Sequence, residues 1–358
     1  MQTEYGVNAP EAVKLWSRKL MHEALKQTWA SKFMGKDSSA VCQIKDDTQK
    51  GAGDRIRTTL RMQLSGAGVQ GDDTLEGKEE KLTTHTDDLL INQLRHAVRS
   101  KGKMTEQRIP FSIREEARMG LQDWWADRID SWFMNQLAGN SAQEDTRYTG
   151  NNAALAPDSS HHIFANSHAS EATMTATASA QFSLGLIDAC RLKAETLKVP
   201  IRKMTGAGGA DYVMFVTPEQ EYDMRRNASS MEWADIQKAA IQGGQISDNP
   251  IFKGALGMYN GVLMHSSYRL PVTDSTGGSK IGRSVFCGAQ AAVMGFGRGD
   301  GPNRMDWTEE LFDYKNSLGV EAGCIAGLKK TRYNSEDFAT MAVSAAHSSN
   351  AASFTGRT

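Results

Sequence analysis

The sequence predicts an α+β fold in which extended parts leave a central body. Three observations support this prediction. Apolar and polar residues alternate from Asp54 to Leu64, as in a strand, and an apolar pattern of helical spacing runs from Ser112 to Gly139. Strand-like and helix-like segments then mix between residues 200 and 300. We therefore expect a strand excursion, one long helix and a compact α/β unit.

The composition limits the class of protein. The 358 residues suffice for two structural units, or for one large unit with excursions. Apolar residues make up 39% and charged residues 23% of the chain, and 41 basic minus 42 acidic residues give a net charge of −1. Such a chain is neither disordered nor a protein that coats nucleic acid through its net charge, although a local basic face is compatible with it.

The cysteines and the apolar runs indicate a reducing compartment. The four cysteines form no CxxC pair and lie far apart in the sequence, which argues against a disulfide framework or a zinc knuckle. The N-terminus lacks a basic start followed by an apolar run, and no stretch of about 18 apolar residues occurs. We expect a soluble cytosolic chain without an exported or membrane stage.

The first 50 residues read as an N-terminal arm. Val13, Trp16 and Leu20 recur at helical spacing behind Asn8 and Pro10, which are typical helix-start residues. The arm therefore contains an amphipathic helix. Packing in the core is the favoured role of Trp16, and contact with a partner subunit is the alternative.

Residues 51–99 form the predicted excursion. The alternating strand after Asp54 carries arginines on its polar face, and a glycine-rich acidic segment then interrupts any regular element. A second extended segment follows from Leu82 to Leu94. Because a two-stranded ribbon alone is only marginally stable in water, it should lean on something outside itself.

The long helix is the clearest element of the sequence. Ser112 and Glu115 are spaced as a capping box, and Gly139 ends the apolar pattern, which predicts a helix about 40 Å long. Three tryptophans at helical spacing favour a packed core over a stacking platform for a cofactor. These tryptophans are Trp124, Trp125 and Trp132.

The second half of the chain alternates strands and helices. Residues 140–180 are polar and show no periodic pattern of apolar residues, so we expect a surface insertion. A helix is expected to follow over residues 180–197. Thr217 and Pro218 mark the start of another helix, and a further helix is expected over residues 231–242. Strands are expected over residues 211–216, 262–272, 284–297 and 318–346 before a Ser/Ala-rich tail.

One histidine cluster resembles a set of metal ligands. His161, His162 and His168 follow Asp158, but they lie in a polar segment with no predicted strand or helix to fix their geometry. Solvated loop histidines are therefore the favoured interpretation, and we predict no metal site.

Glycine-rich segments offer the remaining candidate chemistry. Gly295, Gly297, Gly299 and Gly301 could cradle a phosphate, yet the segment runs on without a helix start, which favours a turn. The GAGG run at residues 206–209 precedes its strand, and the RGD tripeptide at 298–300 lacks an export signal. GxSxG and HExxH are absent, so no catalytic residue and no cofactor is predicted. An α/β enzyme with a glycine-loop site at residues 295–301 stays open as an alternative.

Four sequence blocks resemble a known family. The chain is similar to the major capsid proteins of tailed bacteriophages, specifically the family typified by the N4-like phages. The blocks are FMG from Phe33, LEGKEE with the INQLRHAVRSKGKM run, NPIFKGALGMYNGV from Asn249, and LGVEAGCIAGLKKTRYNSEDF near the C-terminus. They span most of the chain, from about residue 10 to 340.

The resemblance implies the fold of tailed-phage major capsid proteins, which herpesvirus shells share. That fold would divide the chain into an N-terminal arm (1–50), an extended hairpin loop (51–99), a peripheral domain (100–199) with a spine helix (112–139) and the insertion (140–180), an axial domain (200–300), and a return to the peripheral domain with the C-terminal tail (301–358).

The resemblance also implies a function and its partners. Subunits would self-assemble into hexamers and pentamers of an icosahedral shell around double-stranded DNA, as part of a virion assembled in the host bacterial cytoplasm and without contact to a membrane. A separate scaffolding protein and a portal would take part, and a decoration protein is a further candidate. Another phage structural protein, of the tail or of the decoration, is the second alternative.

Inter-subunit contacts are expected from two charged groups. We expect the basic residues after the second extended segment to meet the acidic excursion tip of an adjacent subunit or, as the less favoured partner, packaged DNA. The candidate contact residues are Trp16, Glu76, Lys78, Glu79, Glu80, Arg95, Arg99, Lys101 and Lys103.

Overall fold

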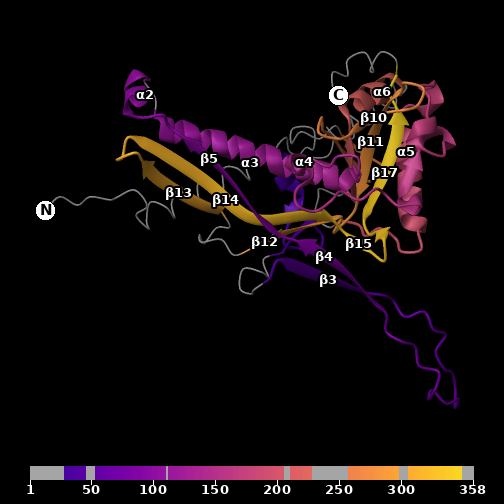
Figure 1. Cartoon of the computed structure of the whole chain (residues 1–358). Helices are drawn as coiled ribbons and strands as arrows, with labels where there is room; N and C mark the ends of the chain where they lie inside the picture. The colour runs from indigo at the N-terminus through magenta and orange to yellow at the C-terminus, as the bar shows by residue number, and fades with distance from the viewer. Residues whose placement is uncertain are drawn as a thin grey trace, which may run out of the picture.

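A computed structural model describes six segments of the chain (Figure 1). They comprise residues 28–45, 53–109, 112–204, 210–227, 257–297 and 305–348. The arm helix with Trp16, the helix at 231–242, the GAGG run and the RGD tripeptide fall outside these residues. Figure 1 shows two lobes joined by a long helix, with a hairpin projecting from the underside.

A six-stranded sheet forms the elongated lobe. Its long central strand β14 pairs with β5 on one side and with β12 and β13 in turn on the other, and β2 and β1 extend the sheet beyond β12. The strands are β1 (Met34–Gly35), β2 (Cys42–Lys45), β5 (Asn92–Arg99), β12 (Ala292–Phe296), β13 (Met305–Phe312) and β14 (Ser317–Lys330).

A seven-stranded sheet forms the second lobe, in the order β6-β17-β11-β7-β9-β8, with β10 paired to β11. Its strands are β6 (His162–Phe164), β7 (Tyr212–Val216), β8 (Gly257–Tyr259), β9 (Val262–Ser266), β10 (Val272–Asp274), β11 (Lys280–Cys287) and β17 (Thr340–Ala346). Helices α5 (Leu184–Thr196) and α6 (Pro218–Asn227) accompany this sheet, and both were expected from the sequence. The predicted start of α6 is confirmed, because Thr217 Oγ1 accepts from the Gln220 amide at 3.2 Å and Gln220 Oε1 accepts from the Thr217 amide at 3.0 Å.

The predicted long helix is α3 (Ile113–Ala138), which connects the two lobes. Its buried face contains Leu121, Phe133 and two of the three tryptophans, Trp125 and Trp132, so the core interpretation of these two is confirmed. Ser112 is the N-cap residue, but its side chain makes no capping hydrogen bond within the described helix, so the predicted capping box is wrong.

The helix ends as the sequence predicted. Gly139 adopts the left-handed conformation at φ +61°, and a Cβ there would lie 2.5 Å from the Leu155 carbonyl oxygen. Arg283 of β11 donates to the carbonyls of Ala138 and Gly139 at 3.2 and 3.1 Å. A cation from the second sheet therefore caps the negative end of the helix dipole.

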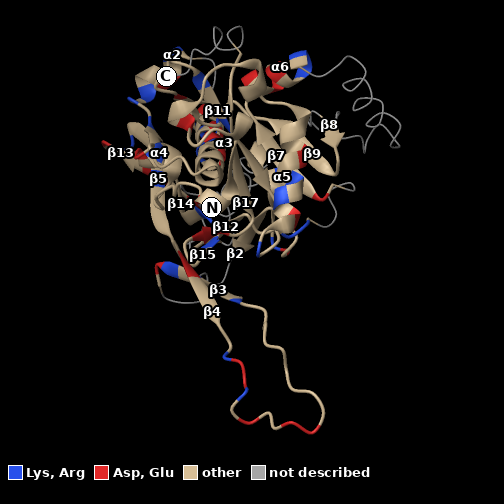
Figure 2. Cartoon of the chain, turned by 90° about the vertical axis from the view of Figure 1, so that its right-hand side faces the viewer, with Lys and Arg blue, Asp and Glu red and all other residues tan. Residues whose placement is uncertain are grey.

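The predicted excursion is a two-stranded hairpin of β3 (Arg55–Arg61) and β4 (Thr84–Leu90). Figure 2 shows the hairpin and its tip loop extending away from both sheets. Short elements complete the described chain: α2 (Lys103–Arg108), α4 (Thr146–Thr149), β15 (Arg332–Tyr333), β16 (Glu336–Asp337) and five single 3₁₀ turns between Trp29 and Ala180.

The sheets divide the chain differently from the predicted ranges. Strand β5 lies within residues 51–99 but belongs to the six-stranded sheet, as does β12 from within 200–300. Strands β6 and β17 come from the ranges 140–180 and 301–358 but belong to the seven-stranded sheet. Residues 140–180 are thus partly built into a sheet instead of lying wholly on the surface. The pairing partners are distant in sequence, so local patterns could not reveal them.

Candidate assembly surfaces

A small separate core fixes the base of the hairpin to the six-stranded sheet. Ile56 and Leu89, directly opposite each other in the hairpin, pack with Ile91 and Val293. A side chain on Gly295 of β12 would collide with Ile56. The glycine therefore lets the hairpin lie directly on the sheet.

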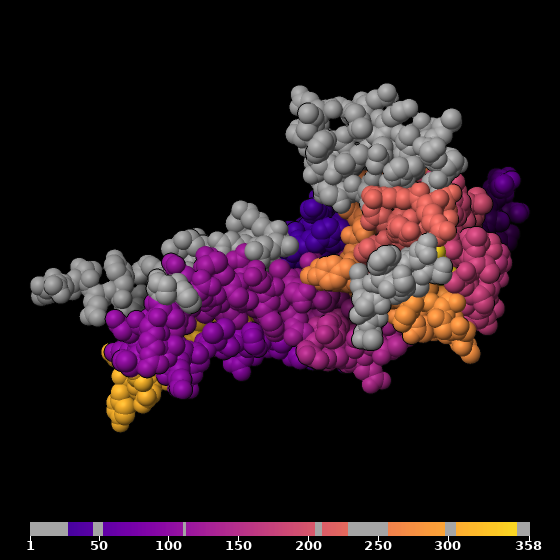
Figure 3. All heavy atoms as spheres, turned by 90° about the horizontal axis from the view of Figure 1, so that it is seen from above, coloured from indigo at the N-terminus to yellow at the C-terminus, as the bar shows by residue number. Residues whose placement is uncertain are grey.

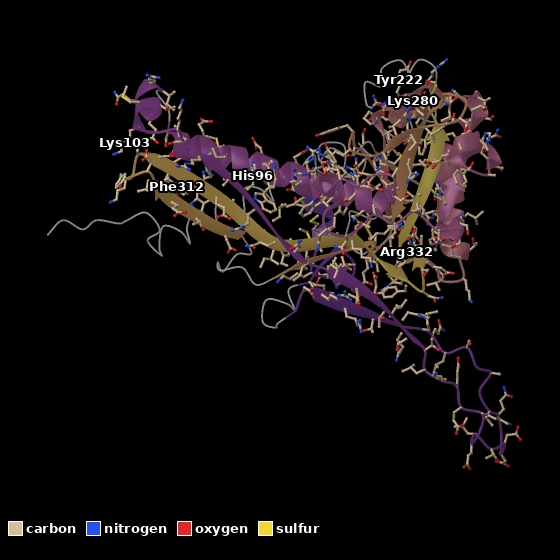
Figure 4. All side chains as sticks on the ribbon, in the orientation of Figure 1. His96, Lys103, Tyr222, Lys280, Phe312 and Arg332 are labelled. Atoms are coloured by element: carbon tan, nitrogen blue, oxygen red, sulfur yellow. The ribbon has the colours of Figure 1, made fainter. Side chains whose placement is uncertain are left out.

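Charged and polar pairs continue this attachment on the same face. Lys329 of β14 forms an ion pair with Asp87 of β4, and Asp87 also accepts from the Arg332 amide at 3.2 Å. Arg332 lies beside the hairpin base in Figure 4. On the outer face, Arg57 binds Asp88 through two hydrogen bonds of 2.7 and 2.8 Å, which fixes the register of the two strands.

Beyond its base the apolar face of the hairpin is not covered. Leu60 and Met62 line an open cavity of about 300 Å³ between the hairpin and the body, whose opposite wall includes Val199 and Tyr333. Further out, the leucines of the hairpin are more than half exposed: Leu64 57%, Leu75 58% and Leu82 54%. A protein surface with this many exposed leucines on a thin projection is typical of an interaction site.

The tip of the hairpin is acidic and is held together by its own side chains. Between residues 72 and 81, five acidic and two basic residues give a net charge of −3. Glu80 accepts from the Ser65 and Gly66 amides at 2.9 and 2.6 Å, and these hydrogen bonds hold the pKa of its carboxyl below the usual value. The Glu80 carboxylate therefore connects the two sides of the tip loop beyond the last paired residues of β3 and β4.

The other predicted tip residues stay exposed. Glu79 accepts from the Gly77 amide at 2.7 Å, and Lys78 lies 3.6 Å from Asp73. The side chain of Glu76 is exposed and forms no hydrogen bond or ion pair with another described residue. Glu76 and Glu79 are thus exposed within the acidic tip loop, which forms the far end of the projecting hairpin (Figure 2).

Three of the four predicted basic residues, Arg99, Lys101 and Lys103, lie at the opposite end of the molecule, whereas Arg95 lies midway along β5. His96 stacks on Trp124 of α3 at 4.5 Å, so strand alternation directs its neighbour Arg95 and, four residues on, Arg99 to the sheet face opposite the helix. Arg99 lies 4.2 Å above the Phe312 ring, and Arg95 lies 3.6 Å from Glu321.

Lys101 and Lys103 continue this basic end. Both side chains are exposed, and Lys103 begins α2 (Figure 4). Between residues 99 and 108, four basic residues and one acidic residue give a net charge of +3. Viewed from above in Figure 3, α2 and the β13–β14 turn form the narrow end of the elongated lobe.

The histidine cluster is structural and partly buried, so the interpretation as solvated loop histidines is wrong for His161 and His162. His161 is 6% exposed and its Nδ1 lies 3.0 Å from Asp158. His162 lies on β6, where its Nε2 is 2.8 Å from Ser344 Oγ and 3.9 Å from Glu171. The described residues contain no group of three or more His, Cys, Asp or Glu arranged to hold a metal ion.

The two described glycines of this segment, Gly295 and Gly297, form no phosphate cradle, and the predicted turn is also wrong for Gly295. This residue lies inside β12, and Gly297 follows directly and packs against Ile325. Apolar side chains fill the space that a phosphate would need. Gly299 and Gly301 fall outside the described residues.

Some residues that shape these surfaces were missed by the sequence reasoning. Asn152, Arg283 and Gly327 lie at joints between elements, and their partners are more than 60 residues away. A glycine inside an otherwise apolar strand was the one available signal, because it suggests close backbone approach. Among the described residues, no helix is long and apolar enough to cross a membrane.

Comparison with known proteins accounts for these features together. A family model described as "Phage capsid protein" matches residues 4–349. The major capsid protein of Pseudomonas phage KPP25 is 28% identical over 95% of this chain and 96% of that relative.

Solved structures agree with this match. The capsid of Ralstonia phage GP4 has 29% identity and a TM-score of 0.79, covering 97% of this chain and 95% of that one. The capsid of cyanophage Pam1, at 17% identity, has the same fold with a TM-score of 0.73, covering 98% and 97%. The resemblance and the tailed-phage capsid fold expected from the sequence are thereby confirmed, and the chain belongs to the phage capsid protein family.

Proposed function

We propose that this capsid protein builds the phage head as its major shell subunit, through head-to-tail association in which each hairpin lies over the neighbouring subunit. The observation that carries this proposal is the uncovered apolar face of the hairpin. The two-stranded ribbon continues into a loop that exposes leucines at positions 64, 75 and 82, and this projection gains stability only when another surface covers it. A second copy of the chain supplies that surface in a closed lattice.

Charge supports the head-to-tail direction. The hairpin tip (72–81) carries −3 and the segment 99–108 at the end of the elongated lobe carries +3, and the two segments lie at opposite ends of one subunit (Figure 1). An interface between two different patches generates rings when its rotation closes, as in hexamers and pentamers. Two like ends would instead repel each other. We therefore propose that Glu76 and Glu79 approach Arg95, Arg99, Lys101 and Lys103 of the next subunit.

We assign parts of the chain to the regions of such a shell subunit. Residues 1–50 serve as the arm, in which Trp16 is a candidate contact, and 51–99 as the extended loop. The ranges 100–199 and 301–358 form the peripheral domain, and 200–300 forms the axial domain. The sheet topology suggests moving β12 to the peripheral domain and β6 and β17 to the axial domain.

Further partners follow from a closed shell. We propose a separate scaffolding protein and a portal for assembly, double-stranded DNA on the inner face, and an outer decoration protein. The net charge of −1 suits a wall around DNA, since strong attraction to phosphate would hinder packing of the genome.

Electron microscopy of the expressed chain, alone and with the neighbouring genes, tests this function. Icosahedral shells, or hexamers and pentamers, are expected. Deleting residues 66–77 should abolish shells while leaving folded, soluble subunits with an unchanged circular dichroism spectrum. Shells of normal size from the deletion variant would contradict the role of the hairpin. Rings or trimers without shells would favour a tail or decoration protein, and a stable monomer under both conditions would contradict the shell function.

A further inference from the structure

The hairpin joins the six-stranded sheet through a very short joint. Leu90 ends β4 and pairs with Arg55 of the hairpin, whereas Asn92 begins β5 and pairs with Ala326 of the sheet. Ile91 alone separates the two strands and donates to the Asp54 carbonyl at 2.9 Å. The covalent connection between hairpin and sheet is therefore very short, and the direction of the hairpin depends on what holds Leu90 and Ile91 in addition to the apolar core and the Lys329–Asp87 ion pair at its base.

Asn152 binds the backbone of Leu90 at the joint, on the edge of β4 that faces away from β3. Its Oδ1 accepts from the Leu90 amide at 3.1 Å, and its Nδ2 donates to the Leu90 carbonyl at 2.9 Å. The N–H and C=O of one extended residue point to the same side, so the Asn152 amide takes the place of a neighbouring strand. The side chain is buried, which makes the loss of either bond costly.

The same residue is tied to the other two elements of the elongated lobe. Nδ2 also lies 3.3 Å from the Leu328 carbonyl of β14, and the Asn152 carbonyl accepts from the buried Gln136 side chain of α3 at 2.6 Å. On the sheet, Gly327 of β14 lies so close to the Leu90 carbonyl that a Cβ at this position would collide with it. Hairpin and sheet thus meet at the Asn152 side chain, and its main-chain carbonyl ties it to the spine helix. The neighbouring Asn151 donates a second hydrogen bond to the Leu90 carbonyl at 2.8 Å.

A small rotation at this joint has a large effect at the tip. At about 3.3 Å per residue, the hairpin from Arg55 to the tip near Gly71 extends up to about 50 Å. A tilt of about 10° would then displace the tip by about 9 Å, close to the spacing of two packed sheets. Such a displacement removes the tip from any specific contact.

We propose that Asn152 is the positioning residue that fixes the angle of the hairpin and, through it, the curvature of the shell. The second half of this inference rests on the proposed function. Asn152 is buried and acts through Leu90, so its role is distinct from that of the exposed contact residues.

Spin labels measure the angle directly on free subunits. The four native cysteines are buried, so cysteines introduced at Gln70 in the tip and Leu192 on α5, both exposed, are labelled selectively. Pulsed EPR should give one narrow distance distribution for the otherwise unchanged chain. Asn152→Leu keeps the branched shape and the number of side-chain heavy atoms and loses the side-chain hydrogen bonds, so its distance distribution should broaden or shift. Its shells in electron micrographs should vary in diameter.

Asn135→Leu is the matched control. Asn135 is also a buried asparagine, near the end of α3, but its side-chain amide bonds Ser131 and Asn140, so loss of these bonds should leave the distance distribution narrow and the shells uniform in diameter. If Asn152→Leu does not fold, Asn152→Ser is measured with the same expectation.

The outcomes separate the two halves of the inference. A narrow, unshifted distance in Asn152→Leu overturns the positioning role. A broadened distance with shells of uniform diameter overturns the link to curvature. Absence of shells from the unchanged chain would contradict the proposed function instead, while the distance distributions still decide the role of Asn152.

Discussion

At the scale of single residues, the joint between the lobes depends on one buried polar network. Arg283 binds both Glu171 oxygens, at 2.8 and 2.7 Å, and also caps α3. Burial opposes ionisation of Glu171, but the Arg283 guanidinium nevertheless holds the pKa of this carboxyl below its usual value. Ser344 donates to the same carboxylate at 2.6 Å and meets His162. The network thus connects α3 to three strands of the second sheet.

His162 makes this network sensitive to acid. Burial, together with the nearby Arg283 charge, lowers its pKa from 6.5 to about 4. The unfolded chain binds this proton more readily, so the contribution to stability is complete above about pH 6.5 and is lost as the pH falls towards 4, on the order of 3 kcal/mol in total. Thermal unfolding of His162→Gln should therefore depend less on pH in this window. His85→Gln, which replaces a half-buried histidine of the hairpin that lies outside this network, is the control, and an unchanged pH dependence in His162→Gln would contradict the assignment.

At the scale of elements, the two glycines of α3 should respond in opposite ways to the same substitution. Gly139→Ala should destabilise the subunit by about 1–3 kcal/mol, because alanine is strained at φ +61° and its Cβ meets the Leu155 carbonyl. Gly120→Ala should stabilise it by about 0.5–1 kcal/mol, since Gly120 lies within the helix with open space around it. Denaturant unfolding of both variants measures the difference. Equal effects would show that the helix end is not held by Gly139.

The same elements show how far the sequence could predict this fold. Helix α3, the hairpin and the start of α6 were predictable because their signals are local: apolar periodicity, strand alternation, and Thr217 before Pro218. The placement of β12 and β17 in different sheets was not, because their partners are distant in sequence.

The candidate site shows the same division. The charged groups of the hairpin tip and of the basic end were predictable, since exposed charge runs are visible in any sequence. The role of Glu80 within the tip was not, because its amide partners lie 14 and 15 residues away across a loop. Asn152 carried no signal at all, since one asparagine in a polar segment is unremarkable until the fold brings Leu90 to it.

At the scale of the whole molecule, the arrangement of charge matters more than its sum. Opposite charges at the two ends of a subunit cancel in the net value of −1, yet they favour one order of subunits in a ring. An exposed ion pair contributes only about 0–1 kcal/mol, but a closed ring repeats the contact at every interface. Because such pairs are screened by salt over about 8–10 Å, the effect should be largest at low ionic strength.

Reversing the charges of the hairpin tip and of the basic end tests whether the two meet. Glu76→Lys with Glu79→Lys, or Lys101→Glu with Lys103→Glu, should each lower the shell yield at low salt, because like charges then meet at every interface. All four changes together should restore the yield, since the attraction is re-established with opposite polarity. Light scattering across a salt series measures this, and Glu144→Lys, an exposed charge away from both ends, is the control. If the fourfold variant assembles no better than either pair alone, the tip and the basic end do not meet. Glu80 is left unchanged because it holds the tip loop itself.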